Sequence, residues 1–190
     1  MIDIAVDTVA GLPEYARISI AFEIADVLDV RSLPGGGAFE LTARRVDRPC
    51  LKDYDAIAGN RPTDWPSRFD VSSWGFFSAS LEGVRVGGAT VARSTPDLDM
   101  LEGRTDLAVL WDIRVAPAVR GQGVGAALFS AAARWAWEQG CREVKIETQD
   151  INVPACRFYA RQGCVLRAVH RGAYPLFPDE LQLLWYKTLG

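Results

Sequence analysis

The stretch that decides the fold is VAPAVRGQGVG, from Val115 to Gly125. It joins a strand-like run at 107–115, stopped by Pro117, to an alanine-rich helical run at 126–139. Glycines at alternate positions let the backbone come close to a ligand, and amide groups at a helix start attract phosphate. Arg120 adds a guanidinium at the same place. The stretch therefore predicts a strand, an anion-binding turn and a helix. A turn that serves only tight strand–helix packing is the alternative.

The spacing of these glycines separates the turn from two better known phosphate-binding motifs. It lacks the third glycine of the dinucleotide-binding GxGxxG pattern, and no Gly-Lys-Ser/Thr follows as in a P-loop.

A second informative stretch is ETQDINVPACRFYARQG, from Glu147 to Gly163. It predicts the end of a strand at 144–149 and a helix at 154–162 with proline in its first turn and glycine just past its end. Glu147 lies on the strand, Asn152 beyond it and Tyr159 on the helix. A carboxylate and a phenol at one cleft suit a general base and a general acid. Taken singly, each has a structural explanation as a paired carboxylate, a helix cap or a half-buried aromatic ring.

The remaining pattern predicts mostly strands. Alternation indicates strands at 18–25 and 39–46 around a turn at 34–37, and a hairpin of 74–81 and 84–93 with a bulge at Gly87-Gly88. Residues 47–70 predict loops with at most one or two short helices. Two closing strands are expected at 165–174 and 181–189. This order predicts an α/β (α+β) domain with helices flanking one mixed central sheet.

Composition limits the functional class. The 190 residues, 49% of them hydrophobic, suffice for one domain with a sizeable core. A net charge of −3 argues against nucleic-acid binding, and a single histidine, His170, excludes a histidine metal cluster or a Ser-His-Asp triad. Four cysteines without a CxxC pair indicate reduced thiols in a cytoplasmic protein. Neither a membrane span nor a secretory leader is expected.

The charge is unevenly distributed along the chain. Residues 1–110 hold 17 acidic and 11 basic residues, whereas residues 111–190 hold 7 acidic and 10 basic residues. An anionic ligand is therefore expected in the C-terminal half and a cationic ligand against the N-terminal half, unless the asymmetry only reflects solvated surface.

Together, the two stretches resemble the GNAT superfamily of acyl-CoA-dependent N-acetyltransferases. The pattern Arg-x-x-Gly-x-Gly is followed about 30 residues later by a strand, Asn, Ala, Tyr and Gly. The second stretch is similar to the streptothricin acetyltransferase branch, as are FELTARRV at 39–46, KDY at 52–54 and LLWYKTL at 183–189. The resemblance covers about residues 17–189 and implies a single GNAT domain over 1–190. Its expected parts are an N-terminal strand and hairpin part at about 1–46, acceptor-side loops at about 47–75, an acetyl-CoA-binding core at about 107–163 and closing strands at about 165–189.

The resemblance also implies roles for individual residues. Tyr159 would protonate the leaving thiolate, and Glu147 would deprotonate the incoming amine, directly or through water. The backbone of Val115 would stabilise the oxyanion. The expected acetyl-CoA-binding residues are Ile113, Arg114, Val115, Arg120, Gly121, Gln122, Gly123, Val124, Gly125, Ala126, Asn152, Ala155 and Tyr159.

One position departs from the streptothricin acetyltransferase pattern, because Trp111 stands where a glutamate is expected. Trp111 could form an aromatic wall for a cationic amine or belong to the core. Strand alternation points Asp112 to the opposite face, unless a bulge re-aims it. Trp74, Trp111 and Asp112 are the candidate acceptor-binding residues. Whether Glu147, Asp112 or a water acts as the base stays open.

These observations predict direct acetyl transfer from acetyl-CoA to the primary amine of a small molecule such as streptothricin. The alternatives are a protein N-terminus, a lysine or a polyamine as acceptor, and a non-catalytic acyl-CoA-binding module. A covalent route through Cys156 would need His170 as its base and is disfavoured. No metal, nucleic acid or membrane partner is expected, and the sequence does not choose between a monomer and a homodimer.

Overall fold

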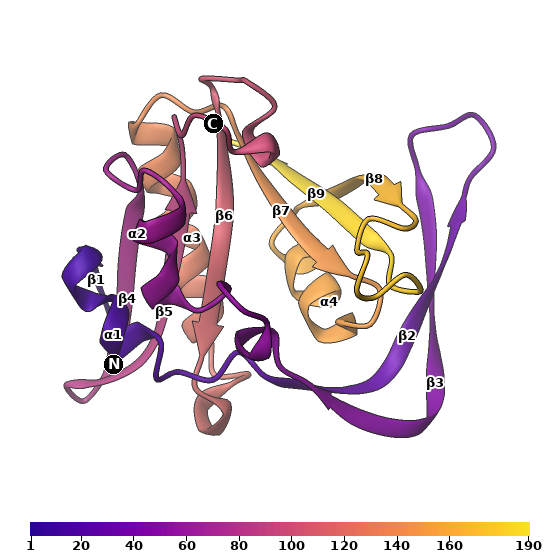
Figure 1. Ribbon diagram of the computed structural model, residues 1–190, viewed down its shortest axis with the longest axis horizontal. Helices are drawn as coiled ribbons and strands as arrows, with labels where there is room; N and C mark the ends of the chain where they lie inside the picture. Colours follow the sequence, from indigo (N-terminus) through magenta and orange to yellow (C-terminus); the bar gives the residue numbers. More distant parts are fainter. The chain divides into compact units, whose positions relative to one another are not determined.

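Figure 1 shows the computed structural model, which describes residues 1–190. The contacts within the chain divide it into two units. Unit 1 consists of Met1–Ile20, Asp53–Val144 and Thr188–Gly190, and unit 2 consists of Ala21–Lys52 and Lys145–Lys187. None of the helices combines the length and the apolar character needed to span a bilayer.

Unit 1 contains four neighbouring antiparallel strands in the order β1-β4-β5-β6. Their bounds are β1 Ile2–Asp7, β4 Gly75–Leu81, β5 Val84–Ala92 and β6 Leu107–Val115. Most residues of β4, β5 and β6 are buried, including four consecutive residues at the start of β6. Consecutive buried residues show that both faces of this sheet are covered.

Helices cover the two faces of the unit 1 sheet. Helix α3 (Val124–Glu138) packs on one face, where Leu128 and Trp135 contact the sheet at Gly87 and Gly75. The short helices α1 (Leu12–Tyr15) and α2 (Trp65–Arg68) cover the other face. The Tyr15 ring lies so close to Gly88 that a Cβ there would approach it to 2.6 Å, so this position admits only glycine without rearrangement.

Short 3-10 segments join these elements. They are η1 Val9–Gly11, η2 Tyr54–Ala56, η3 Pro62–Asp64, η4 Asp99–Leu101 and η5 Pro117–Val119.

Unit 2 contains three strands in the order β7-β9-β8, one helix and a separate hairpin. The bounds are β7 Glu143–Gln149, α4 Val153–Arg161, β8 Val165–His170 and β9 Gln182–Thr188, with the hairpin formed by β2 Phe22–Ser32 and β3 Phe39–Lys52. Strands β8 and β9 are antiparallel, and α4 packs against β2. Ile146, Val153 and Leu183 are among its most buried side chains.

The long hairpin corrects one prediction. Residues 47–52, predicted as loop, belong to β3. The pairing jumps from Ile24–Cys50 to Asp26–Arg45, so β3 carries extra residues here. Pro49 lies in this irregular part, where its missing N–H costs no regular ladder bond. The bulge predicted at Gly87-Gly88 lies one residue earlier, because the pairing passes from Ala79–Gly87 to Ser80–Arg85 and leaves Val86 as the extra residue of β5.

Candidate functional site

The glycine-rich turn leads from η5 into the first turn of α3. Gly121 and Gly123 have φ angles of +82° and +89°, which glycine adopts without the strain of other residues. Gly123 is the N-cap of α3, so no side chain caps the first backbone amides of the helix. A Cβ on Gly121 would meet nothing within 4 Å, and one on Gly123 only the Ile2 side chain at 3.8 Å. The space beside Gly121 and Gly123 is therefore open, and the amides at the start of α3 have no side-chain cap, as an anion-binding site requires.

Arg120 supports this turn. Its Nε donates to the carbonyl oxygen of Val115 at 3.0 Å and its Nη2 to that of Ser19 at 3.1 Å. The residue is exposed. The guanidinium thus holds the turn to the end of β6 and keeps a positive charge beside the exposed amides.

A bulge on β6 re-aims Asp112. Thr90 pairs with Asp112 and Val91 with Leu110, which leaves Trp111 as the extra residue of β6. Such a bulge shifts the alternation of side chains by one position. Trp111 and Asp112 accordingly both lie on the side of the sheet that α1 and α2 cover, with Trp111 against Trp74 and Asp112 against Tyr15.

Asp112 belongs to a buried polar network. Tyr15 donates to its Oδ1 at 2.8 Å, and the guanidinium of Arg114 donates to both carboxylate oxygens at 2.7–3.1 Å. Arg114 also donates to Asp55 at 2.6 and 2.9 Å and to the carbonyl oxygen of Ile18 at 3.3 Å. Burial raises the pKa of Asp112 and raises that of Tyr15 well above its usual value. These contacts favour a structural role for Asp112 over acceptor binding.

Loss of Arg114 should destabilise unit 1 strongly. Its side chain is 1% exposed, so Arg114→Met leaves Asp112 buried without its cation. We expect the free energy of unfolding to fall by about 3–5 kcal/mol, as for other broken buried pairs. Urea denaturation measures the change, with Arg134→Met on the exposed face of α3 as the matched control. Equal stability of both variants would show that the network contributes little.

Two of the predicted acceptor-side residues belong to an aromatic cluster. Trp74 is buried, and its Nε1 donates to Thr95 at 2.7 Å. The half-buried Trp111 packs against Trp74 and Phe69, with ring centroids 5.5 and 5.2 Å away. Trp74 is therefore a core residue, and only Trp111 keeps part of its ring exposed.

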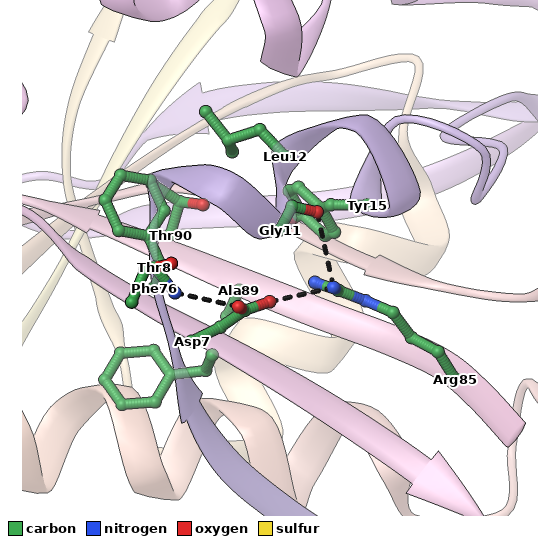
Figure 2. A pocket seen from close by; sticks show the side chains of 10 residues that line it. Asp7, Thr8, Gly11, Leu12, Tyr15, Phe76, Arg85, Ala89 and Thr90 are labelled. Carbon is green, nitrogen blue, oxygen red and sulfur yellow. Dashed lines mark hydrogen bonds and ion pairs between the residues drawn. The ribbon is translucent and has the colours of Figure 1, made fainter. Parts of the chain in front are cut away.

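Figure 2 shows a small hollow of unit 1 beneath η1 and α1. Asp7 accepts hydrogen bonds from Arg85 at 2.8 Å and from the backbone N–H of Thr8 at 2.7 Å, and Arg85 also donates to the carbonyl oxygen of Gly11 at 3.3 Å. Asp7 and Arg85 form a structural ion pair in this hollow, although the buried Nε of Arg85 has no hydrogen-bond partner.

In unit 2, Glu147 lies in a network of neutral polar side chains. Its Oε1 accepts from the Tyr174 hydroxyl at 2.7 Å and its Oε2 from the amide of Gln182 at 2.8 Å. Gln149 donates to the Tyr174 hydroxyl at 2.8 Å and lies 3.5 Å from Glu147. No lysine or arginine forms an ion pair with Glu147, and its carboxylate is held only by hydrogen bonds from uncharged side chains. Tyr174 and Gln182 are not predicted from the sequence, because no local pattern connects them to Glu147.

The other predicted residues of unit 2 lie on α4. Asn152 caps this helix, because its Oδ1 accepts from the backbone N–H of Ala155 at 3.2 Å. Tyr159 is buried, with its ring centroid 5.1 Å from that of Phe158.

Cys156 is placed for packing. Its Sγ lies 3.4 Å from the Thr148 hydroxyl and 3.6 Å from the carbonyl oxygen of Gln149, and burial raises its pKa to about 11. His170 is exposed and bonds Gln182 at 2.8 Å. A Cys156–His170 pair is therefore absent from the structure, which disfavours a covalent route.

Cysteine reactivity should follow burial. Cys50 is exposed, whereas Cys141, Cys156 and Cys164 are buried with raised pKa values. Because the thiolate is the reactive form, iodoacetamide at pH 8 should label Cys50 first. Mass spectrometry of the digested protein locates the label. Rapid labelling of Cys156, or complete loss of activity in a folded Cys156→Ala variant, would contradict its packing role.

Comparison with known proteins assigns the family. The model of the Acetyltransferase (GNAT) family matches residues 43–164, a range that includes both the glycine-rich turn and α4. The chain belongs to the GNAT family of acetyltransferases. Streptothricin acetyltransferase from Escherichia coli is 30% identical to this GNAT chain over 172 residues, which are 89% of the chain and 86% of the relative. The enzyme of that name from Streptomyces lavendulae is 29% identical over 183 residues, 96% of the chain and 88% of the relative.

A third relative matches a shorter segment of the GNAT chain. Streptothricin acetyltransferase A from Bacillus subtilis is 42% identical over 81 residues. This segment is 42% of the chain and 47% of that relative, so the chain spans about half of its length.

Solved structures show the same fold. A Bacillus anthracis protein in complex with acetyl coenzyme A superposes with a TM-score of 0.80 at 22% identity, over the full length of both chains. Nourseothricin acetyltransferase gives a TM-score of 0.76 at 23% identity, over 100% of this chain and 99% of that one. The predicted α/β GNAT fold and the predicted acetyl-CoA-dependent acetyltransferase family are thereby confirmed.

Proposed function

We propose that this GNAT acetyltransferase transfers the acetyl group of acetyl-CoA to a primary amine of streptothricin or a closely related small molecule. The observation that carries the proposal is the similarity to two streptothricin acetyltransferases over 89% and 96% of the chain. The departure at Trp111 concerns the acceptor rather than the acetyl transfer.

The donor site rests on the glycine-rich turn. The amides from Gly121 to Ala126 bind the pyrophosphate of acetyl-CoA, and Arg120 adds its charge. The backbone of Ile113 and Val115 pairs with the pantetheine arm, and Asn152 and Ala155 contact the same arm. The open space above Gly121 and Gly123 supports this assignment.

The chemistry requires proton transfers on both reactants, because the amine nitrogen loses protons and the departing thiolate gains one. The amine arrives as an ammonium ion, and Glu147 removes a proton directly or through water. The amine nitrogen then forms a bond to the thioester carbonyl carbon, and a backbone N–H of Val115 stabilises the oxyanion. The C–S bond breaks, and Tyr159 donates a proton to the departing thiolate. The acetylated nitrogen then loses its extra proton to the resulting Tyr159 phenolate, directly or through solvent. The products are the N-acetylated amine and CoA. The absence of a cationic partner for Glu147 supports its role as base.

Gly123→Val should weaken acetyl-CoA binding. The side chain would project into the space assigned to the pyrophosphate, and we expect a rise in the acetyl-CoA Kd of at least about tenfold. Isothermal titration calorimetry measures the Kd.

Gly140→Val is the matched control, because Gly140 follows the other end of α3 with a φ of +88°. It carries the same backbone strain as Gly123→Val and should bind acetyl-CoA normally. If the two folded variants have the same Kd for acetyl-CoA, the pyrophosphate does not bind at the glycine-rich turn.

An amine panel tests the acceptor. Streptothricin, lysine-containing peptides and polyamines are each incubated with the protein and acetyl-CoA, and CoA release is measured. The proposal predicts the highest kcat/KM for streptothricin. Faster acetylation of peptides or polyamines would show that the acceptor is not streptothricin. CoA binding without turnover of any amine would indicate a non-catalytic module.

A further inference from the structure

Unit 2 contains a cavity of about 620 Å³. This volume lies within the range of small-molecule binding sites. Three segments contribute its walls: hairpin β2–β3 (Figure 1), the residues after β7, and the connection between β8 and β9. Its lining includes the charged residues Asp29, Arg31, Asp150, Arg171, Asp179 and Glu180.

The residues predicted to bind the acceptor do not line an open site in unit 1. Trp74 is a core residue, and the carboxylate of Asp112 is occupied by Tyr15 and Arg114. Apart from Trp111, the side chains expected to meet the acceptor are thus engaged inside unit 1. The cavity in unit 2 offers the space that these positions lack.

Two pairs of charges around the cavity neutralise each other. Asp29 lies 3.6 Å from Arg44, and Glu180 lies 2.5 Å from Lys52. Four charged side chains of the lining have no such ion pair: Asp150, Asp179, Arg31 and Arg171. The cavity therefore presents two carboxylates for cations and two guanidinium groups for oxygen atoms.

Asp150 is the most buried of these four residues, at 5% exposure. Its Oδ1 accepts from the backbone N–H of Leu181 at 2.9 Å, which ties the end of β7 to the start of the closing strand. Burial raises the pKa of Asp150, and a cation in the cavity would offset the cost of its buried charge.

The cavity and Glu147 share the same chain segments. Asp150 follows Glu147 by three residues. Tyr174 and Gln182, which hydrogen bond to Glu147, flank the residues Asp179 to Leu181 that line the cavity. A molecule that occupies the cavity is therefore held by the segments that orient the proposed base.

We propose that this cavity binds the scaffold of the amine acceptor. The acceptor is a primary amine that carries a second cationic group and several oxygen atoms. Asp150 and Asp179 contact the second cation, and Arg31 and Arg171 donate to the oxygens. This inference rests on the proposed function and assigns it a substrate class in which oxygen-bearing amines are preferred over simple polyamines.

Single-charge variants test the cavity. Asp179→Asn and Arg171→Gln change exposed residues, so both should fold. Each should raise the KM for streptothricin by about tenfold, with kcat and the acetyl-CoA Kd unchanged. The controls Glu138→Gln and Arg134→Gln make the same charge changes on exposed positions of α3 and should leave the KM unchanged. An unchanged KM in both cavity variants would overturn the proposal.

A comparison of two amines distinguishes the cation-binding role of the carboxylates from the oxygen-binding role of the guanidinium groups. Spermidine is cationic and has no oxygen atoms. Arg171→Gln should raise the KM for streptothricin and leave that for spermidine unchanged, whereas Asp179→Asn should raise both. An equal effect of Arg171→Gln on both amines would contradict the oxygen-binding role.

Direct binding distinguishes failure of the cavity from failure of the proposed function. Calorimetry with streptothricin and the full chain needs no turnover. If the wild type binds streptothricin but acetylates no amine, the proposed function fails, and reduced affinity in Asp179→Asn would still support the cavity. If the wild type acetylates streptothricin and both cavity variants bind it normally, the cavity proposal fails alone.

Discussion

Replacing Tyr159 with phenylalanine should lower kcat by about 100- to 10,000-fold, the usual contribution of general acid catalysis. The departing thiolate is then protonated only by water. The change keeps the aromatic ring, which is buried on α4 beside Phe158, so packing should persist. The acetyl-CoA Kd should remain near the wild-type value, since only the hydroxyl is removed. Single-turnover kinetics with saturating acetyl-CoA measure the chemical step.

A second phenol serves as the control for Tyr159. Tyr186 is also buried in unit 2, on β9, and has no role in the proposed reaction. Tyr186→Phe should keep the single-turnover rate. A Tyr159→Phe variant that matches it would show that solvent protonates the thiolate and that Tyr159 is only a packing residue.

Glu147→Gln should lower kcat/KM most strongly at low pH. Free amine is scarce there, so turnover depends on a base that takes the proton from the ammonium ion. We expect a loss of about 100- to 10,000-fold at the acid end. The loss should shrink as the pH rises toward the pKa of the substrate amine, because the deprotonated amine then needs no base. Glutamine keeps two polar atoms at the position, which limits the disturbance of Tyr174 and Gln182.

The shape of the pH–rate profile distinguishes a base from a positioning residue. Glu147→Asp keeps a carboxylate, so its profile should have the wild-type shape at a lower rate. The Glu147→Gln profile should instead converge toward the wild type as the pH rises. Parallel profiles for wild type and Glu147→Gln would leave Glu147 as an orienting residue.

Local sequence signals predict the strand and helix bounds in the second half of the chain well. The predicted strand at 107–115 is β6, and the predicted helix at 154–162 is α4 shifted by one residue. Both have strong boundary signals, with Pro117 after the strand and Asn152, Pro154 and Gly163 around the helix. Helix α3 begins at Val124 rather than Ala126, because the glycine N-cap precedes it.

The first half was harder to predict because its structure depends on distant pairing. Strand β1 is a short run in which Ile2, Ile4 and Val6 alternate with other residues, and its partner β4 lies about 75 residues later. The hairpin β2–β3 extends past Pro49 because β3 accommodates extra residues opposite β2. The extension of β3 past Pro49 depends on this pairing and not on a local pattern of alternation.

In the candidate site, too, the features encoded locally are predictable and those that depend on distant contacts are not. The turn at Arg120–Gly125 was predicted because backbone geometry is encoded locally by glycine. The β6 bulge at Trp111 could not be placed in advance, since it exists only in the pairing with Thr90 and Val91. The partners of Glu147 and the cavity of unit 2 join segments that are far apart in the sequence.

The most direct test of the account is a mass-spectrometric measurement on the wild-type protein mixed with acetyl-CoA, with and without streptothricin. Direct transfer predicts streptothricin that carries one acetyl group, one CoA released per product, and no acetylated protein when the amine is omitted. An acetyl-enzyme in the absence of amine, or bound acetyl-CoA that is never transferred, would contradict it.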